Sequence, residues 1–520
     1  MKIIKYSIIF LLMGILSYCK AQSLPKSSTE EFLYRPNFHF TPKSNWMNDP
    51  NGMFYLEGTY HLFFQYYPEG NKWGPMHWGH ATSKDLIKWK EQKIALYPDH
   101  LGYIFSGSAV VDKNNTSGFG NGKNTPIVAI FTYHNSEKEK EHKIDVESQG
   151  IAYSIDNGKN WIKYSNNPVL KNPGIRDFRD PKVIWDIKRQ QWLMVLAAQN
   201  KVHFYTSKNL KNWEFVSEFG QNIGAHGGVW ECPDIFPIKV NETDEEKWVL
   251  LVSINPGGPN GGSATQYFVG DFDGKTFKPD ETNIKQLQKN GAIWLDWGKD
   301  NYASVSWNNA PNGRKIVIGW MSNWDYAQEV PTEKWRSSST IAREVILSKN
   351  NEGYLLKTLP VNELSHYLKN NIKKKSIIDK NNILIKKNEI ELDKTVLELE
   401  LKDLKKDTYT FVLSNELGEQ LSFGINNVDN YLFINRQKSG IINFGNNFAN
   451  KVSKVPLLSN YKEASFKVLL DKTSLEIFFN NGEKVMTELF FPREKYSELS
   501  ISTEAIQSTI SMQAYQINIK

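Results

Sequence analysis

The feature that most constrains the fold is a long succession of short apolar runs with β-type composition. Val, Ile, Leu and Trp dominate the segments 127–131, 192–196, 248–252 and 315–319. Turn residues separate these runs, and no long segment has the 3.6-residue apolar period of an amphipathic helix. Short apolar runs bounded by turn residues are typical of strands. The sequence therefore predicts an all-β protein with few helices.

A polar turn followed by a Trp recurs three times in the first half of the chain. The three examples are 83–85 with Trp89, 154–158 with Trp161, and 207–209 with Trp213. In each, a Ser and an Asp or Asn can hydrogen-bond their own backbone, and the Trp can anchor a hairpin. Repeated hairpins of this kind are typical of β-propeller blades.

A sharp change in composition divides the chain into two parts. All 16 Trp residues lie between Trp46 and Trp335, and the last 185 residues have none. The tail alternates apolar and polar residues at 396–402 and 474–478, with a hairpin turn at 480–482, which favours an antiparallel β-sandwich. We expect a first domain at 36–345, a linker at 346–372 and the β-sandwich at 373–520.

The N-terminal residues have the pattern of a removable secretion signal. Lys2 and Lys5 precede an apolar run at 8–16 that is too short to span a bilayer, and a cleavage site follows at 19–21. We expect a signal peptide at 1–21 and a secreted or periplasmic protein. The alternative is a cell-surface lipoprotein anchored through Cys19. No membrane-spanning segment is predicted.

Charge and cysteine content exclude some classes of partner and of stabilisation. Loss of residues 1–21 removes three lysines and no acid, which lowers the formal net charge from +6 to +3. That is too weak a charge to favour nucleic acid as a partner. Only Cys232 then remains, so the mature chain has no intrachain disulfide.

Three acidic residues lie in similar local settings. Asp49 is in the block W-M-N-D-P-N-G (46–52), Asp180 in F-R-D-P (178–181) and Glu231 in W-E-C-P-D (230–234). We expect a tight turn at 49–52, followed by a hairpin around residues 57–58. Each acid stands beside a proline and an aromatic residue or Arg. Burying a carboxylate is costly and needs compensation. Three acids in such similar settings are expected to share one site.

In this order, the three blocks resemble the signature of the fructan-cleaving glycoside hydrolases of family 32, which include invertases, levanases and inulinases. The resemblance covers most of residues 36–345 and continues more weakly to the C-terminus. It implies a five-bladed β-propeller catalytic domain followed by a C-terminal β-sandwich. The family mechanism needs no cofactor and no metal, and the histidines show no metal-ligand spacing.

The resemblance also implies roles for individual residues in a retaining mechanism. Asp49 is the nucleophile, Glu231 the general acid/base, and Asp180 a transition-state stabiliser. Substrate-binding groups are expected at Asn48, Gln65, Trp73, Ser108, Arg179 and Trp324. From their neighbours, we expect turn amides to keep Asp49 ionised and Arg179 to keep Asp180 ionised. Asp234 is interpreted as structural.

The stretches 227–236 and 319–336 look most like the exo-acting levanase and inulinase branch, although Ala342 stands where relatives commonly have Pro. The expected activity is release of terminal fructose from β-fructans (levan, inulin) and from sucrose. One alternative is an endo-levanase or a fructosyltransferase that uses the same site. Another is a catalytically silent fructan-binding protein, which would not need all three acids. The Ser154-x-Asp156-x-Gly158-x-x-Trp161 pattern also suggests a sialidase-type propeller, but the Arg cluster such enzymes use is not evident.

Overall fold

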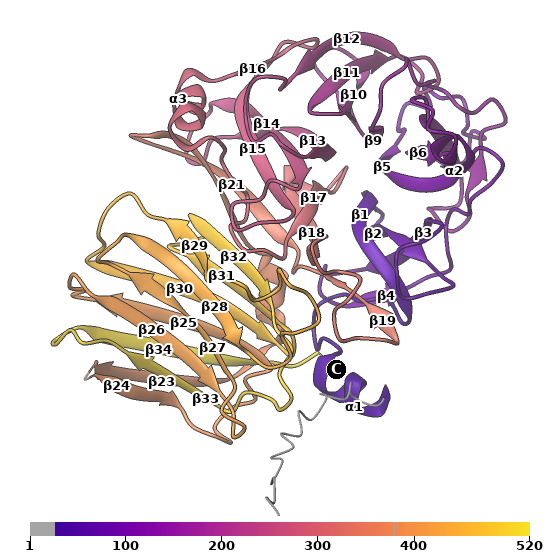
Figure 1. Cartoon of the computed structure of the whole chain (residues 1–520). Helices are drawn as coiled ribbons and strands as arrows, with labels where there is room; N and C mark the ends of the chain where they lie inside the picture. Colours follow the sequence, from indigo (N-terminus) through magenta and orange to yellow (C-terminus); the bar gives the residue numbers. More distant parts are fainter. Residues whose placement is uncertain (1–26, 379, 520) are drawn as a thin grey trace, which may run out of the picture.

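The computed structural model describes residues 27–378 and 380–519, and the predicted signal peptide lies outside these residues. Two bodies lie side by side, a ring of small sheets and a β-sandwich (Figure 1). In the described residues the α-helices are α1 (Ser27–Tyr34), α2 (Ser136–Lys140) and α3 (Glu281–Asn290), with short 3-10 segments η1 (Pro311–Gly313) and η2 (Asn362–Tyr367). The expectation of an all-β fold with few helices is confirmed.

The ring consists of five sheets, each built mainly from consecutive antiparallel strands. The first contains β1 (Asn45–Leu56), β2 (Thr59–Tyr67), β3 (His77–Ser83) and β4 (Trp89–Glu91), with β19 (Trp335–Arg336) parallel to β1. The second contains β5 (Tyr103–Val111), β6 (Ile127–His134), β7 (Glu147–Ser154) and β8 (Ile162–Lys163). The third contains β9 (Phe178–Asp186), β10 (Gln191–Ala198), β11 (Lys201–Ser207) and β12 (Glu214–Phe219).

The fourth sheet contains β13 (Val229–Lys239), β14 (Glu246–Asn255), β15 (Ala264–Phe272) and β16 (Phe277–Pro279). The fifth contains β17 (Tyr302–Ser306), β18 (Ile316–Met321), β21 (Arg343–Asn350) and β22 (Gly353–Pro360), and β20 (Ser338–Ser339) also pairs with β18. The first strand of each sheet lies at the centre of the ring: β1 contacts β5 and β17, β9 contacts β5 and β13, and β13 contacts β17. The arrangement is a β-propeller, and five sheets fit the five blades expected.

The repeated Ser-and-Trp turns occupy the same position in three successive sheets. Each connects the third strand of its sheet to the fourth, and the hydroxyl of the first Ser bonds the Asp or Asn two residues later. Each Trp then donates its indole N–H to a backbone carbonyl three residues earlier: Trp89 to Leu86 at 3.1 Å, Trp161 to Gly158 at 3.2 Å, and Trp213 to Leu210 at 3.1 Å. The local pattern therefore sets the outer edge of each blade.

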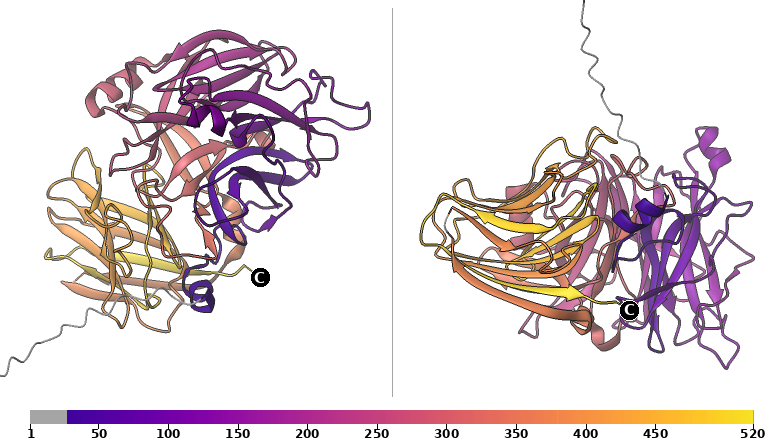
Figure 2. Two further views of the ribbon diagram at one scale, coloured as in Figure 1. Left: turned by 45° about the vertical axis from the view of Figure 1, so that its right-hand side comes forward. Right: turned by 90° about the horizontal axis from the view of Figure 1, so that it is seen from below.

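The sandwich packs two six-stranded sheets over one apolar core (Figure 2). One sheet contains β23 (Leu368–Ile377), β34 (Thr509–Ile517), β25 (Lys394–Lys402), β30 (Glu463–Asp471), β31 (Ser474–Phe479) and β32 (Lys484–Leu489). The other contains β24 (Asn381–Ile385), β33 (Glu498–Ser502), β26 (Thr408–Ser414), β27 (Gln420–Asn426), β28 (Tyr431–Lys438) and β29 (Ser453–Pro456).

The stretch 346–372, expected to be a linker, contains regular structure. It includes most of the β21–β22 hairpin, whose turn lies between the paired Asn350 and Gly353, and it ends inside β23. The residues of a hairpin turn are those of a linker, which is why the sequence pattern does not tell them apart. The strands place the connection between the two bodies at 361–367, around η2.

A buried network of charged side chains joins the ring to the sandwich. His39 lies between two carboxylates of the sandwich, with Nδ1 2.8 Å from Asp471 Oδ2 and Nε2 2.6 Å from Glu476 Oε1. These acids raise the pKa of His39 to about 9, although burial alone would lower it. Arg343 of β21 donates to Glu476, and this pairing lowers the pKa of Glu476 to about 2. The two bodies are thus held in one fixed relation by ionised groups.

Candidate active site

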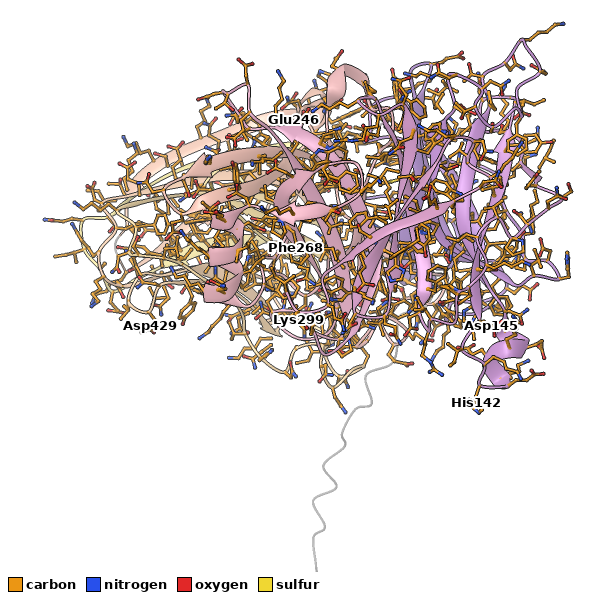
Figure 3. All side chains as sticks on the ribbon, turned by 90° about the horizontal axis from the view of Figure 1, so that it is seen from above. His142, Asp145, Glu246, Phe268, Lys299 and Asp429 are labelled. Carbon is orange, nitrogen blue, oxygen red and sulfur yellow. The ribbon has the colours of Figure 1, made fainter. Side chains whose placement is uncertain are left out.

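A cavity of about 600 Å³ opens on the axis of the ring, at the end where the central strands begin. It brings together the three acids of the sequence blocks and most of the predicted sugar-binding residues. The predicted residues that line it are Asn48, Asp49, Gln65, Trp73, Arg179, Asp180, Glu231 and Trp324. On one side the rim continues into the segment that contains α2, and Figure 3 shows this segment, with His142 and Asp145, projecting beyond the ring.

Asp49 lies within strand β1, and the prediction of a tight turn at residues 49–52 is wrong. Instead, β1 pairs with β2 through two register shifts, between Met47 and Pro50 and between Asn51 and Phe54. Gly52 has φ +59°, and a Cβ there would come within 2.6 Å of the Trp78 ring. Residues typical of turns thus produce bulges here, because β1 stays paired with β2 both before and after them. The hairpin expected at residues 57–58 does follow, since Leu56 pairs with Thr59.

The Asp49 carboxylate is buried and weakly satisfied. Its Oδ1 has no hydrogen-bond partner in the described part of the chain, and its Oδ2 is 3.7 Å from the Cys232 thiol. Burial raises the pKa of Asp49 to about 8, and the charges of Glu231 and Asp180 add to this effect. The expected backbone donors are not among its partners in the described residues, so turn amides do not hold this group ionised.

Asp180 lies at the start of β9 with φ +64°, a left-handed backbone conformation. Its amide donates to Thr132 Oγ1 at 3.0 Å, and its Oδ2 accepts the Cys232 amide at 2.9 Å. Burial and the charge of Glu231 raise the pKa of Asp180 to about 7, although Arg179 opposes the shift. The expectation that Arg179 keeps this acid strongly ionised is therefore wrong.

The Arg179 guanidinium binds other carboxylates. Its Nη1 is 2.9 Å from Glu147 Oε1 and 2.7 Å from Asp177 Oδ1, and its Nη2 is 3.1 Å from Glu231 Oε1. Side chains of consecutive strand residues normally point to opposite faces. The left-handed conformation at Asp180 breaks that alternation, so that Arg179 and Asp180 both line the cavity. Arg179 thereby links the second, third and fourth sheets.

Glu231 lies near the start of β13, just before a register shift between β13 and β14. One carboxylate oxygen accepts from Arg179, and the other accepts from the hydroxyl of Tyr302 on the neighbouring strand β17. Its side chain keeps 19 % of its surface exposed, which makes it more open to solvent than Asp49 and Asp180. A partly exposed carboxyl oriented by two donors is well placed to exchange a proton with a ligand in the cavity.

Most of the predicted substrate-binding residues form the walls of this cavity. Asn48 accepts the Trp46 indole N–H at 2.7 Å, and Gln65 Nε2 is buried without a partner in the described residues. Trp324 stacks on Trp46 with ring centroids 5.9 Å apart. Trp73, at the rim, is 38 % exposed. Gln65 thus offers a free donor beside the acids, and the two Trp side chains offer flat apolar surfaces.

Ser108 is the predicted residue that does not line the cavity. Its hydroxyl is buried in β5 and accepts the Val183 amide of β9 at 2.8 Å. Ser106, two residues earlier on the same face of the strand, lines the cavity in its place. Asp234 also lies away from the cavity: it is fully buried, binds Lys182 Nζ at 3.0 Å and accepts the Ser306 amide.

Sequence reasoning missed two residues that hold the acids in place. Tyr302 contacts Glu231, and Glu147 bonds both Arg179 and the Phe178 amide. Neither residue lies in one of the sequence blocks, and the two come from different sheets. A Tyr in a short β-run has no local signal of its own, so only the packing of the sheets reveals these partners.

The described residues contain neither a candidate metal site nor a candidate membrane-spanning helix. No group of three or more His, Cys, Asp and Glu side chains is placed to hold a metal ion in that part of the chain. No helix within the same residues is long and apolar enough to cross a membrane.

Comparison with known proteins gives matches along almost the whole chain. Residues 39–358 match the glycosyl hydrolases family 32 N-terminal domain, and residues 363–516 match the family 32 C-terminal region. The levanase of Bacillus subtilis is 45 % identical over 467 residues, which cover 88 % of this chain and 66 % of the levanase. The extracellular exo-inulinase of Aspergillus niger is 38 % identical over 510 residues, which cover 92 % of this chain and 94 % of that protein.

Solved structures agree with these matches. The exo-inulinase of Aspergillus awamori superposes with a TM-score of 0.84 at 35 % identity, covering 93 % of this chain and 98 % of that one. A fructofuranosidase of Schwanniomyces occidentalis in complex with fructose superposes with a TM-score of 0.83 at 34 % identity, covering 94 % and 99 % of the two chains.

Proposed function

The chain belongs to glycosyl hydrolase family 32, and we propose that it releases terminal fructose from β-fructans and from sucrose. The levanase and exo-inulinase names of its relatives support this substrate class, as does the fructose complex of a structural neighbour. The observation that carries the proposal is the convergence of Asp49, Asp180 and Glu231 in one cavity from three different sheets. Donors and aromatic walls of the kind that bind a sugar surround these acids.

We assign Asp49 as the nucleophile and Glu231 as the acid/base of a retaining mechanism. Glu231 donates its proton to the glycosidic oxygen while Asp49 attacks C2 of the terminal fructosyl unit. The C2–oxygen bond breaks, the leaving sugar departs as an alcohol, and an ester joins fructose to Asp49. Water then gives a proton to Glu231 and its oxygen to C2. Cleavage of the ester frees fructose and returns both carboxyl groups to their starting states.

The charges of the three acids in the cavity are coupled. Burial and mutual repulsion raise the pKa values of Asp49 and Asp180, so the site tends to keep a proton at neutral pH. When the proton is on Glu231, the charge that opposes ionisation of the other two acids is gone. A proton on Glu231 therefore makes this residue a general acid and favours the ionised form of Asp49. Arg179 and Tyr302 hold the Glu231 carboxyl in position.

Asp180 is the proposed stabiliser of the transition state. Its Oδ2 accepts a hydrogen bond from the Cys232 amide, which holds the carboxylate in place. The Cys232 thiol contacts both this carboxylate and that of Asp49, so the two acids lie side by side. A carboxylate held this way can accept hydrogen bonds from hydroxyl groups of the fructosyl ring, and these bonds strengthen as positive charge develops at C2.

The roles can be separated by rescue with azide. With an activated aryl β-fructofuranoside, Glu231→Ala plus azide is expected to give the β-fructosyl azide, because azide attacks the ester intermediate from the face that water uses. Asp49→Ala plus azide is expected to give the α-fructosyl azide, because azide then replaces the nucleophile. Glu139 is another carboxylate at the rim of the same cavity, and Glu139→Gln is the control that should keep near wild-type activity. The opposite pairing of products would reverse the two assignments.

A time course of products tests the mode of action. Chromatography on levan, inulin and sucrose should show fructose alone from the first time points, and the relative rates give the preferred linkage. A ladder of oligosaccharides would instead indicate an endo-acting or transferring enzyme on the same residues. Retained fructan binding without any product would leave the catalytically silent binder as the better interpretation.

We further propose that the protein is exported after cleavage at the end of residues 1–21. The relatives named extracellular exo-inulinases support secretion. Sequencing of the mature N-terminus from cell-surface and medium fractions tests this. A start at Gln22 in the medium is expected, whereas a blocked, lipid-modified Cys19 at the surface would favour the lipoprotein alternative.

A further inference from the structure

The ring has a second cavity on its axis, at the end opposite the acids. Its volume is about 460 Å³, and it is lined by the last residues of four central strands, β5, β9, β13 and β17, and by the segments that follow β5 and β17. Val111, Trp185, Phe236 and Ser306 represent these strands. No step proposed above uses this cavity.

A buried ion pair closes the axis between the two cavities. Lys182 of β9 donates to Asp234 Oδ2 at 3.0 Å, to the Ser306 carbonyl at 2.6 Å and to Ser306 Oγ at 3.0 Å. Only a void of about 10 Å³ adjoins this plug on the side of the acids. A substrate in one cavity therefore does not reach the other, and a ligand of the second cavity would bind independently.

Just over half of the wall of the second cavity is apolar, and four aromatic side chains contribute to it. Trp192 and Trp307 are almost fully buried, and their indole N–H groups are already bonded to Thr116 Oγ1 and the His61 carbonyl. Trp185 meets Trp192 edge to face, with ring centroids 4.8 Å apart, and Ile187 at the rim is 74 % exposed. Such a wall suits a flat apolar ligand body.

Lys315 supplies a charge without a directly bonded counter-ion, and the charges of Asp234 and Glu246 act on it only from a distance. Its ammonium has no hydrogen bond or ion pair in the described residues, and it lies 5.8 Å from the centroid of the Phe236 ring. Burial lowers the pKa of this lysine. The other charged groups of the interior are satisfied: Arg314 pairs with Glu344 and Glu363, and Asp112 accepts hydrogen bonds from Thr116 and Ser117.

An ammonium without a direct partner in a partly buried cavity costs free energy, and an anion that enters the cavity would lower that cost. Lys113 at the rim also lacks an ion pair in the described residues, but its side chain is exposed to solvent. We propose that this cavity binds a small organic anion with a planar apolar body, whose acid group pairs with Lys315 and whose ring lies against Trp185 and Phe236.

The test is isothermal titration of the full chain with 2-naphthoate and with its neutral isostere 2-naphthylmethanol. We expect one molecule of naphthoate to bind per chain. The neutral isostere and the variant Lys315→Met should each bind at least tenfold more weakly. Lys113→Met is the matched control and should change the affinity less than twofold. Saturating fructose, present to occupy the opposite cavity, should leave the titration unchanged.

Three results would overturn the proposal. They are no binding of naphthoate, equal affinity for Lys315→Met and the wild type, and loss of binding in the presence of fructose, which would place the probe in the other cavity. Trp185→Leu gives a second test that leaves every charge in place, and it should weaken naphthoate binding at least threefold. Unchanged thermal midpoints of the variants show that the substitutions leave the fold intact.

Discussion

The same substitution, Asp to Asn, is expected to have opposite effects on stability at two buried positions of the propeller axis. Asp49 has a carboxylate oxygen without a partner, and burial and like charges raise its pKa to about 8. Asp234 is also fully buried, but it pairs with Lys182 Nζ at 3.0 Å and accepts the Ser306 amide. We predict that Asp49→Asn stabilises the fold above neutral pH, whereas Asp234→Asn destabilises it.

The sign at Asp49 follows from linkage between protonation and folding. The folded state binds the proton more tightly than the unfolded state, so the stabilisation is fully present below pH 4 and is lost as pH rises through about 8. At about 1.4 kcal/mol per pH unit, the wild type loses up to about 4 kcal/mol between pH 4 and pH 7. Because Asp180 and Glu231 share the same protons, we expect about 2 kcal/mol.

Asn at position 49 has no proton to lose, so the variant should be insensitive to this effect. Its advantage over the wild type should be near zero at pH 4 and largest above pH 8. At position 234, by contrast, Asn leaves Lys182 buried without its counter-ion. The expected cost there is about 3 kcal/mol at all pH values at which the lysine is charged.

Urea denaturation of the two variants and the wild type at pH 4.5, 6, 7.5 and 9 measures both effects. Thermal midpoints under the same conditions should follow the same order. A difference between Asp49→Asn and wild type that does not grow with pH would refute the electrostatic reasoning. A stabilised Asp234→Asn variant would refute the assignment of Asp234 as the partner of Lys182.

Three further predictions test other parts of the structure. His39→Gln should remove a stabilisation of about 3 kcal/mol at the domain interface, which is fully present below pH 6.5 and is lost as pH rises through about 9. The urea midpoints of the variant and the wild type should therefore converge above pH 9. A difference that stays constant with pH would contradict this prediction. Arg179→Met should lower kcat/KM for sucrose at least 100-fold and destabilise the fold by about 3 kcal/mol, because Glu147 stays buried without its main partner. Arg179→Lys should recover part of this stability. A Met variant as stable as the wild type would argue against the ion pair. Trp73→Ala should raise KM about tenfold with little change in kcat in initial-rate assays, since this side chain lies at the rim and away from the acids; a fall in kcat alone would place it elsewhere.

Much of the fold followed from local patterns. Short apolar runs bounded by turn residues predicted an all-β chain, and the Ser-and-Trp turns identified the outer hairpins of three successive sheets. These signals are local, because a Ser hydroxyl and a Trp indole bond groups within a few residues of themselves. The change in Trp content indicated two bodies, but the hairpin turn at 350–353 was mistaken for part of a linker because turns and linkers use the same residues.

Local patterns failed where strand pairing changes the backbone. Residues 49–52 have turn chemistry, but pairing with β2 keeps them in a strand with bulges. Arg179 precedes Asp180 in sequence, yet its guanidinium bonds Glu147, Asp177 and Glu231, and Asp180 itself has a left-handed backbone conformation. Neither outcome is encoded in the residues adjacent to the acids.

The sequence by itself determined which acids and aromatic residues are available and that the chain forms short strands around them, because motif, composition and periodicity are properties of neighbouring residues. Only the tertiary structure decided which of these groups meet. Closure of the ring brings the beginnings of β1, β9 and β13 together, which places Asp49 beside Asp180 and Cys232 and gives Glu231 its Tyr302 partner. It also decides charge: repulsion between acids more than 50 residues apart in sequence, and the loss of water around them, raise pKa values that local sequence suggested would be low.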